Sequence, residues 1–370
     1  MKICLLLLLA TTAAAGQSPA VSRITPGDIE SALEPIRQKY GLPALGGAIL
    51  TDPYSFVAGV TGVRKFGTTV AATAGDEWHL GSDTKAMTAT VIAQLVEKDS
   101  LRWESTIGEI FGAEAQTFPS DFRNITLLEL LSHHAGLQPN LAWGTIAQSG
   151  GSAMEQRRRS LTEAARSKLQ SKPGTEFSYS NLGYVLAGAV AEHATGKSWE
   201  ELMREIVFRP LRITECGFGG SGTPAKIDQP WPHTSSGHPM PENGPAVDNP
   251  AVLGPAGTVH CSLQAWSKFV ADQLAGERGA GKILKQETYR FLHTPPFGGY
   301  YALGWGVVDR PWGGGKVLTH AGSNTMNYAV VWAAPLKQFA VLVVTNQGDD
   351  QAAKACDEAA SALIKMHQGQ

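Results

Sequence analysis

Three short stretches of the chain carry residue types that could perform acyl transfer: Ser82–Lys85 (Ser-Asp-Thr-Lys), Tyr179–Asn181 (Tyr-Ser-Asn) and His320–Gly322 (His-Ala-Gly). On a helix, residues i and i+3 share a face, so Lys85 can fold back toward the hydroxyl of Ser82. A serine hydroxyl is a weak nucleophile until a neighbouring base removes its proton. A position at the start of a helix would also surround a developing oxyanion with backbone N–H groups. The spacing therefore predicts Ser82 as a nucleophile.

The base that activates Ser82 is left open between Lys85 and Tyr179. A tyrosine that serves as a base at neutral pH must lower its pKa from about 10 to about 7, which corresponds to about 4 kcal/mol. A neutral lysine needs a depression of similar size, and a coupled pair need not have a single base. Simpler roles compete with catalysis: Ser82 could cap a helix, Lys85 could be a surface residue, and Tyr179 could pack under the next helix.

A Ser-x-x-Lys spacing alone is weak evidence, because a chain with this many serines and lysines should contain it about once by chance. The order of the three stretches adds weight, and further landmarks follow them. Taken together, the chain resembles the serine β-lactamase and penicillin-binding protein superfamily. The Tyr-x-Asn triplet is similar to the class C branch, which also holds D-Ala-D-Ala carboxypeptidases, D-aminopeptidases and esterases. The further landmarks are Leu130–Leu137 (LLSHHAGL), Pro255–Ser262 (PAGTVHCS) and Leu303–Val307 (LGWGV).

The resemblance implies binding roles for Asn181, His320, Gly322 and Ser323. The side-chain amide of Asn181 would bind the substrate carbonyl and orient Lys85, although an asparagine before an apolar helical run is also a good N-cap. Gly322 would let a substrate approach the strand edge, and the backbone N–H of Ser323 would be a second oxyanion donor beside that of Ser82.

The histidine at position 320 departs from class C β-lactamases, which carry a Lys-Thr-Gly there, whereas peptidases of the branch often carry His-x-Gly. Histidine is mostly neutral above pH 7. If His320 reads a substrate carboxylate, turnover should weaken as the pH rises. Efficient penicillin hydrolysis is therefore less strongly indicated than acyl transfer itself.

Composition describes an ordinary globular protein with ample core material: 370 residues, 43% hydrophobic, 17% charged and a net charge of −2. This charge provides no field for nucleic acid, and the Arg157–Arg159 run is interpreted as a solvated helix face. Lys2, an apolar run and small residues predict a signal peptide over residues 1–16, and no segment after it is long enough to span a membrane. We therefore expect an exported, soluble protein.

The mature chain would hold three cysteines, Cys216, Cys261 and Cys356. An exported protein could form one disulfide among them, but the sequence does not choose the pair, and three thiols are an equal alternative. The Cys and His spacings do not resemble a zinc site, so neither a metal nor an organic cofactor is expected.

Apolar periodicity predicts an α/β (α+β type) fold, and the resemblance implies the same. An antiparallel sheet would be flanked by N- and C-terminal helices, with an inserted, mostly helical lobe of β-lactamase/transpeptidase type. Residues 17–370 would form one catalytic unit, with a sheet lobe from about 26–81 and 256–370 and a helical lobe from about 82–255. The unpatterned stretch 217–255 is expected to border the active-site cleft.

These observations predict an exported serine hydrolase that forms an acyl-enzyme on Ser82 with the help of Lys85 and Tyr179. Its substrate would be a small molecule or peptide, with a D-amino-acid peptide favoured narrowly over a β-lactam. The alternatives are a carboxylesterase of the same fold and a non-hydrolytic receptor for peptides or penicillin. Oligomeric state is left open.

Overall fold

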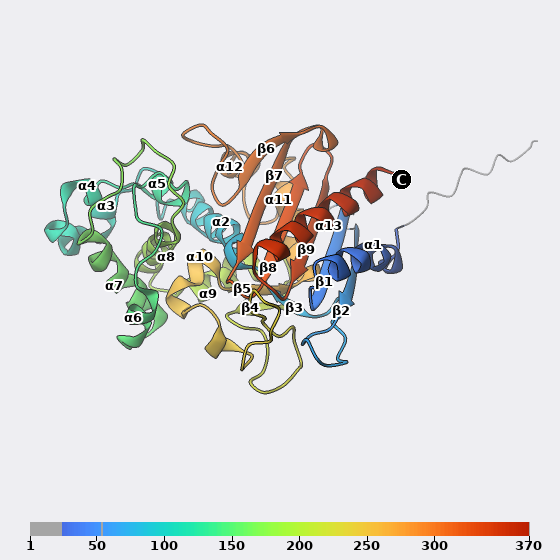
Figure 1. Cartoon of the computed structure of the whole chain (residues 1–370). Helices are drawn as coiled ribbons and strands as arrows, with labels where there is room; N and C mark the ends of the chain where they lie inside the picture. Colours follow the sequence, from blue (N-terminus) through green and yellow to red (C-terminus); the bar gives the residue numbers. More distant parts are fainter. Residues whose placement is uncertain (1–23, 53–54, 370) are drawn as a thin grey trace, which may run out of the picture.

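The computed structural model describes residues 24–52 and 55–369, and its centre is a six-stranded antiparallel sheet (Figure 1). Strands from the two ends of the chain meet in the middle of the sheet, where β1 pairs with β9. The mixed α/β architecture expected from the sequence is therefore confirmed. In sheet order the strands are β2 (Ser55–Gly62), β1 (Ala44–Asp52), β9 (Phe339–Thr345), β8 (Tyr328–Ala334), β7 (Gly315–Ser323) and β6 (Gly306–Arg310).

Strand β9 is a continuous apolar run, and its burial on both faces of the sheet explains this pattern. All seven of its residues are buried, because helices cover both faces of the sheet. Val341 and Val343 belong to the core cluster on one face, whereas Leu342 and Val344 belong to the cluster on the other. Successive side chains alternate between faces, so an apolar residue is needed at every position.

The two terminal helices, α1 (Pro26–Lys39) and α13 (Asp350–Gln368), lie side by side over one face of this sheet (Figure 1). Thr25 and Asp28 form a capping box that fixes the start of α1. On the opposite face, α11 (Leu263–Gly276) packs against β1, β2, β8 and β9.

The middle of the chain is mainly helical and lies to one side of the sheet (Figure 1). Its two central helices, α2 (Thr84–Glu97) and α8 (Asn181–Thr195), are buried along most of their length. Arg157, expected on a solvated face, is instead fully buried against Glu192 and Glu200. The other helices are α3 (Ile107–Phe111), α4 (Ser120–Arg123), α5 (Leu127–Leu131), α6 (Trp143–Gln148), α7 (Ala153–Ala165), α9 (Trp199–Met203), α10 (Gly254–Gly257) and α12 (Gln286–Leu292).

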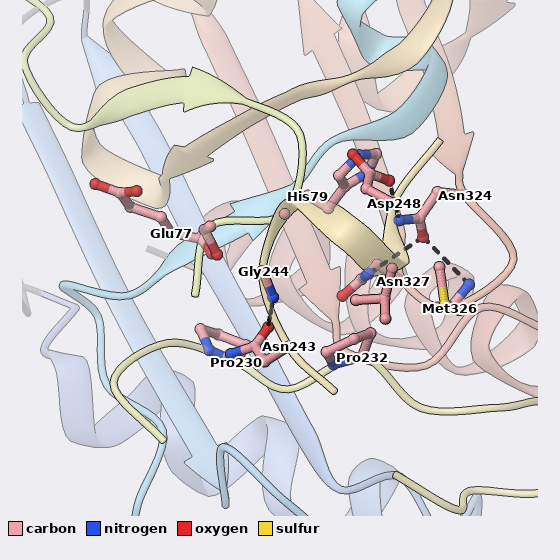
Figure 2. A pocket seen from close by; sticks show the side chains of 13 residues that line it. Glu77, His79, Pro230, Pro232, Asn243, Gly244, Asp248, Asn324, Met326 and Asn327 are labelled. Carbon is pink, nitrogen blue, oxygen red and sulfur yellow. Dashed lines mark hydrogen bonds and ion pairs between the residues drawn. The ribbon is translucent and has the colours of Figure 1, made fainter. Parts of the chain in front are cut away.

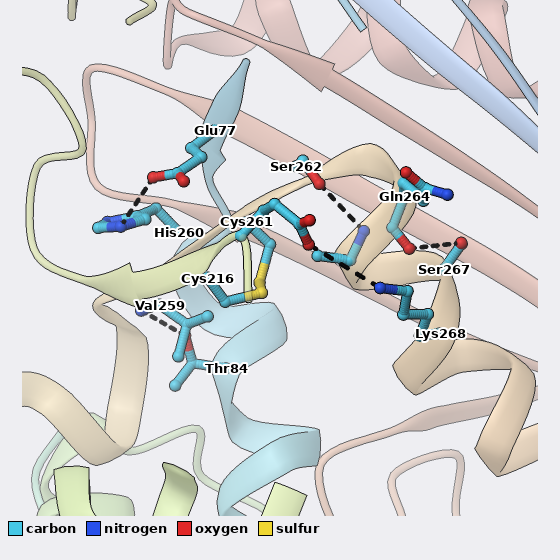
Figure 3. Close-up of a disulfide and its surroundings, with 12 residues drawn as sticks. Glu77, Thr84, Cys216, Val259, His260, Cys261, Ser262, Gln264, Ser267 and Lys268 are labelled. Atoms are coloured by element: carbon cyan, nitrogen blue, oxygen red, sulfur yellow. Dashed lines mark hydrogen bonds and ion pairs between the residues drawn. A yellow bond between two sulfur atoms is a disulfide. The ribbon is translucent and has the colours of Figure 1, made fainter. Parts of the chain in front are cut away.

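A second, three-stranded sheet joins the helical region to the main sheet, in the order β3 (Glu77–His79), β5 (Val259–Ser262) and β4 (Cys216–Phe218). Cys216 and Cys261 are register partners on β4 and β5 and form a disulfide (Figure 3), which identifies the pair that the sequence left open. Cys356 is a buried free thiol. Strand β4 lies within the range expected to be mostly helical, and the lobe boundaries stay a prediction.

Strand β6 begins at Gly306, just after Gly304, whose positive φ of 81° turns the chain. The signal peptide predicted for residues 1–16 lies outside the described residues. Within residues 24–52 and 55–369, every helix is too short or too polar to cross a membrane.

Candidate active site

Ser82 lies in a short 3₁₀ turn, η1 (Gly81–Asp83), that leads directly into α2. The α-helix itself begins at Thr84, two residues later than expected, yet the side chains of Ser82 and Lys85 still meet, with 2.9 Å between Ser82 Oγ and Lys85 Nζ. The capping alternative is wrong, because the N-cap position of α2 is Asp83, which makes no side-chain cap bond. The Ser82 hydroxyl is therefore engaged by other side chains, and the residue is only half-buried.

Lys85 is fully buried, and within the described residues the hydrogen-bond partners of its Nζ are neutral oxygen atoms. Its Nζ lies 2.7 Å from the carbonyl oxygen of Ala256, 2.8 Å from Oδ1 of Asn181 and 2.9 Å from Oγ of Ser82. Its Nζ also lies 4.9 Å from the ring centroid of Tyr179 and 5.5 Å from that of Tyr184. Burial lowers the pKa of Lys85 well below its usual value. A neutral amine has two N–H bonds and one lone pair. The carbonyl and the amide oxygen can only accept, so they take the two hydrogens, and the lone pair is left facing the Ser82 hydroxyl.

Asp83 is the acidic residue beside Lys85, and it is buried too. Burial raises the pKa of Asp83 well above its usual value, an effect that Lys85 only partly offsets. Within the described part of the chain, neither carboxyl oxygen has a hydrogen-bond partner. Burial thus favours the neutral form of Asp83, although the charge of Asp83 acts to raise the pKa of Lys85 and so offsets part of the effect of burial there.

Tyr179 completes the cluster, with its hydroxyl donating to Ser82 Oγ at 2.8 Å. Burial raises the pKa of Tyr179 above its usual value, the opposite of the depression that a phenolate base requires. The ring packs on His133, with 4.3 Å between ring centroids, and His133 Nδ1 accepts from the backbone N–H of Ser180. The pKa shifts in the cluster therefore favour the neutral form of Lys85 and the protonated form of Tyr179.

Asn181 is the first residue of α8 and is free to reach Lys85, because Ser180 caps the helix. The Ser180 hydroxyl accepts from the backbone N–H of Gly183. Asn181 Oδ1 accepts from Lys85 Nζ, and its Nδ2 donates to Oδ1 of Asn140 at 3.0 Å. Of the two roles considered for Asn181, the geometry supports the orientation of Lys85 and excludes the cap.

The C-terminal end of β7 passes directly over the turn that holds Ser82. A Cβ on Gly322 would lie 2.5 Å from the backbone nitrogen of Ser82, and a Cβ on Gly81 would lie 2.3 Å from that of Ser323. Only glycine permits this approach, and Gly81 also has a positive φ of 50°. Strand β6 pairs with β7 only as far as Thr319, and Ser323 is exposed. The backbone amides of Ser82 and Ser323 are thus brought together beside an open strand edge.

His320 lies at the site, but its ring cannot read a substrate carboxylate as the sequence suggested. The carbonyl of Ala321 can only accept, so Nδ1 carries the hydrogen at 2.9 Å, and Nε2 accepts from the hydroxyl of Tyr301 at 3.0 Å. Burial, with a smaller effect from Lys85, lowers the pKa of His320 to about 3. The ring is neutral throughout the physiological range and both nitrogens are occupied. The expected loss of carboxylate binding near pH 6.5 is therefore corrected.

Several contacts at the site were not anticipated from the sequence. Ala256 lies in the PAGTVHCS stretch, which was noted as a landmark but not for its carbonyl group. Asn140 and Tyr301 carried no signal, since their contacts depend on how loops fold back on the site. His133, which packs on Tyr179, has a positive φ of 63°, and this is unusual for a residue with a side chain.

Comparisons with known proteins identify the family and the fold of the chain. The family model described as Beta-lactamase matches residues 29–364. Penicillin-binding protein 4 of Amycolatopsis lactamdurans is 25% identical over 300 residues, which cover 78% of this chain and 77% of that protein. The octameric penicillin-binding protein homologue from Pyrococcus abyssi superposes with a TM-score of 0.74 at 22% identity, covering 92% of this chain and 77% of that one. The D-amino acid amidase from Ochrobactrum anthropi SV3 gives 0.73 at 19% identity, covering 92% and 98%.

Proposed function

The chain belongs to the β-lactamase family, and from this premise we propose that it is a serine hydrolase that forms an acyl-enzyme on Ser82. One observation carries the proposal: Ser82 Oγ lies 2.9 Å from the nitrogen of a buried lysine and 2.8 Å from the hydroxyl of Tyr179. Both distances are within direct proton-transfer reach.

In the first half-reaction, the lone pair of Lys85 accepts the Ser82 proton as Oγ attacks the substrate carbonyl carbon. The N–H groups of Ser82 and Ser323 stabilise the negative oxygen of the tetrahedral intermediate. The carbon–nitrogen or carbon–oxygen bond then breaks, and the Lys85/Tyr179 pair returns one proton to the leaving group. In the second half-reaction, the same pair takes a proton from water, which attacks the ester and releases the acid and Ser82.

For the substrate, we propose the amide bond of a D-amino-acid peptide or amide in preference to a β-lactam. A β-lactam and a peptide with a C-terminal carboxylate both carry a negative charge, and the neutral ring of His320 does not attract it. The amidase that superposes on this chain has a D-amino acid amide substrate class by its name, which supports a substrate without that charge.

We also propose that the protein is exported. The predicted signal peptide and the Cys216–Cys261 disulfide support this, because structural disulfides persist mainly in oxidising compartments. N-terminal sequencing of the protein recovered outside the cytoplasm should begin near residue 17. A mature protein that retains Met1 would contradict the proposal.

Labelling with a fluorophosphonate probe, read by intact mass and peptide mapping, tests the function directly. We expect one adduct, located on Ser82 and lost in Ser82→Ala. A panel of D-amino-acid amides, D-Ala-D-Ala peptides, nitrocefin and nitrophenyl esters then identifies the substrate class, including the carboxylesterase alternative. A folded protein that binds these compounds without labelling or turnover would support the receptor alternative and contradict the hydrolase.

A further inference from the structure

Three polar side chains from distant parts of the chain, His79, Asp248 and Asn324, form a chain of hydrogen bonds beside a small pocket (Figure 2). His79 ends β3, Asp248 belongs to the 217–255 stretch, and Asn324 follows the last residue of β7. The side chains of His79 and Asp248 are only 5% and 2% exposed. None of the three is part of the Ser82, Lys85 and Tyr179 cluster.

The direction of the first hydrogen bonds is fixed by the backbone. The N–H of Gly81 can only donate, and it lies 3.1 Å from His79 Nδ1, which must therefore be the unprotonated ring nitrogen. The ring hydrogen on Nε2 is then donated to Asp248 Oδ2 at 2.9 Å. His79 thus connects the residue before Ser82 to a buried carboxylate.

The other carboxylate oxygen of Asp248 binds Asn324, at the opposite end of the hydrogen-bonded chain from Gly81. Asp248 Oδ1 accepts from Asn324 Nδ2 at 2.8 Å. The Asn324 amide cannot reverse freely, because its Oδ1 already accepts from the backbone N–H of Met326 at 3.2 Å and from Asn327 Nδ2 at 3.1 Å. Burial alone would raise the pKa of Asp248, but His79 and Asn324 outweigh it and hold the pKa below its usual value. Asp248 is therefore an ionised acceptor of two donors.

The two ends of this hydrogen-bonded chain flank the two backbone amides of the site. Gly81 directly precedes Ser82, and Asn324 directly follows Ser323. The two segments are already packed closely, since a Cβ on Gly81 would lie 2.3 Å from the Ser323 nitrogen. The hydrogen bonds from Gly81 through His79 and Asp248 to Asn324 thus connect the two segments that carry the Ser82 and Ser323 N–H groups.

We propose that His79, Asp248 and Asn324 are positioning residues that hold the two oxyanion-binding amides in register, so that the 217–255 stretch controls the reaction through Asp248. The inference rests on the proposed function, because the two amides matter only if a tetrahedral oxyanion forms there. Misplacing such donors by about 1 Å costs roughly 100-fold in rate, mainly in the transition state.

The test compares Asp248→Asn with a matched control, Glu277→Gln. Asparagine can accept at only one oxygen, and its NH₂ group would face His79 Nε2–H or Asn324 Nδ2–H. Glu277 likewise accepts from a buried histidine, His293, and from Lys316, at the opposite end of β7 from Ser323. Each change removes one charge from a carboxylate with two donors, in side chains that are 2% exposed for Asp248 and 11% for Glu277. Only Asp248 lies beside the amides.

We expect Asp248→Asn to lower kcat by about 10- to 100-fold with KM changed less than about threefold, and to weaken inhibition by a phenylboronic acid to a similar degree. The boronate forms a tetrahedral adduct on Ser82 and reports on oxyanion binding directly. Glu277→Gln should lower the melting temperature but leave kcat and boronate inhibition within about threefold of wild type.

A second variant keeps the test informative if Asp248→Asn does not fold. His79→Gln can still donate to Asp248 but offers the Gly81 N–H no acceptor, so it should show the same kcat loss. In the folded double variant that carries both Asp248→Asn and His79→Gln, the two losses in kcat should not multiply. Each single substitution already breaks the same chain of hydrogen bonds.

Wild-type kcat and boronate inhibition in Asp248→Asn or His79→Gln, or an equal kcat loss in Glu277→Gln, would overturn the inference while leaving the hydrolase intact. A wild-type protein that reacts with neither fluorophosphonate nor boronate would instead overturn the proposed function and this inference with it.

Discussion

Two fully buried cationic side chains, Lys85 and Arg157, lie in the same helical region but have opposite surroundings. Arg157 donates to two carboxylates, Glu192 at 2.7 Å and Glu200 at 2.8 Å, which raise its pKa although burial acts against them. The hydrogen-bond partners of Lys85 Nζ in the described part of the chain are neutral oxygens, and burial lowers the pKa of Lys85. The same depth of burial therefore accompanies a raised pKa at Arg157 and a lowered pKa at Lys85, beside the hydroxyl of Ser82.

Lys85 and Arg157 differ in the charge of their hydrogen-bond partners and not in their degree of burial. A cationic side chain that is buried away from water must be paired with an opposite charge, or it becomes neutral by losing a proton. Arg157 joins α7 to α8 and α9 as a permanent cation. At Lys85, burial outweighs the opposing effect of Asp83, so the pKa is lowered and the neutral amine is favoured.

The largest effect should come from Lys85→Met, which retains the length of the side chain without its nitrogen. Loss of the base should lower the rate of acyl-enzyme formation by about 10²- to 10⁴-fold, measured by stopped-flow or quenched labelling of Ser82. Circular dichroism should show a folded protein. If the variant retained the wild-type acylation rate, Lys85 would not be the base, and the contrast drawn between Lys85 and Arg157 would be wrong.

Arg157→Met should show the reverse. Glu192 and Glu200 would be left without their cation, so the free energy of unfolding should fall by about 3–5 kcal/mol, measured by urea denaturation. The folded fraction should retain a kcat close to wild type, and Arg157→Lys, which keeps a charge, should be less destabilising. A large kcat loss in folded Arg157→Met would place this cation in the catalytic machinery.

Tyr179→Phe should have a smaller effect than Lys85→Met, because Tyr179 donates a proton and does not accept the first one. We expect a drop in kcat of about 10- to 100-fold. The acid limb of the pH profile should not move, since that limb reports Lys85. A limb that shifts by more than one pH unit on this substitution would assign the base role to the phenol.

The smallest effect concerns His320, a third buried basic group. Its pKa of about 3 leaves it neutral above about pH 4. KM for a carboxylate-bearing substrate should therefore be flat from pH 6 to pH 8, with no inflection near 6.5. A KM that rises through this range in wild type but not in His320→Gln would restore the carboxylate-reading role.

The sequence predicted those features that depend on the periodicity of apolar residues or on residues close together in the chain. The strands and terminal helices follow from apolar periodicity, and the Ser82–Lys85 contact follows from the i, i+3 geometry of one turn. The choice between a capping role and a Lys85-binding role for Asn181 depends on the preceding residue. Because Ser180 caps the helix, the side chain of Asn181 is available to bind Lys85.

Protonation states and loop contacts were beyond the reach of the sequence. The charge of His320 depends on its burial and on Tyr301, which approaches through tertiary packing. The same is true of the choice between Lys85 and Tyr179 as base, since burial shifts the two pKa values in opposite directions. Asp248 and Asn140 belong to stretches without periodicity, so no pattern marks their partners.

The central claim is that Lys85 is a neutral amine at physiological pH and removes the proton of Ser82. The pH dependence of the rate at which a fluorophosphonate modifies Ser82, measured from pH 4 to pH 11, tests it most directly. Because the pKa of Lys85 lies well below 10.5, the rate should rise on the acid side and reach a plateau by neutral pH. A rate that keeps rising about tenfold per pH unit from 8 to 10 would show that the base still holds its proton at neutral pH, and would contradict the account.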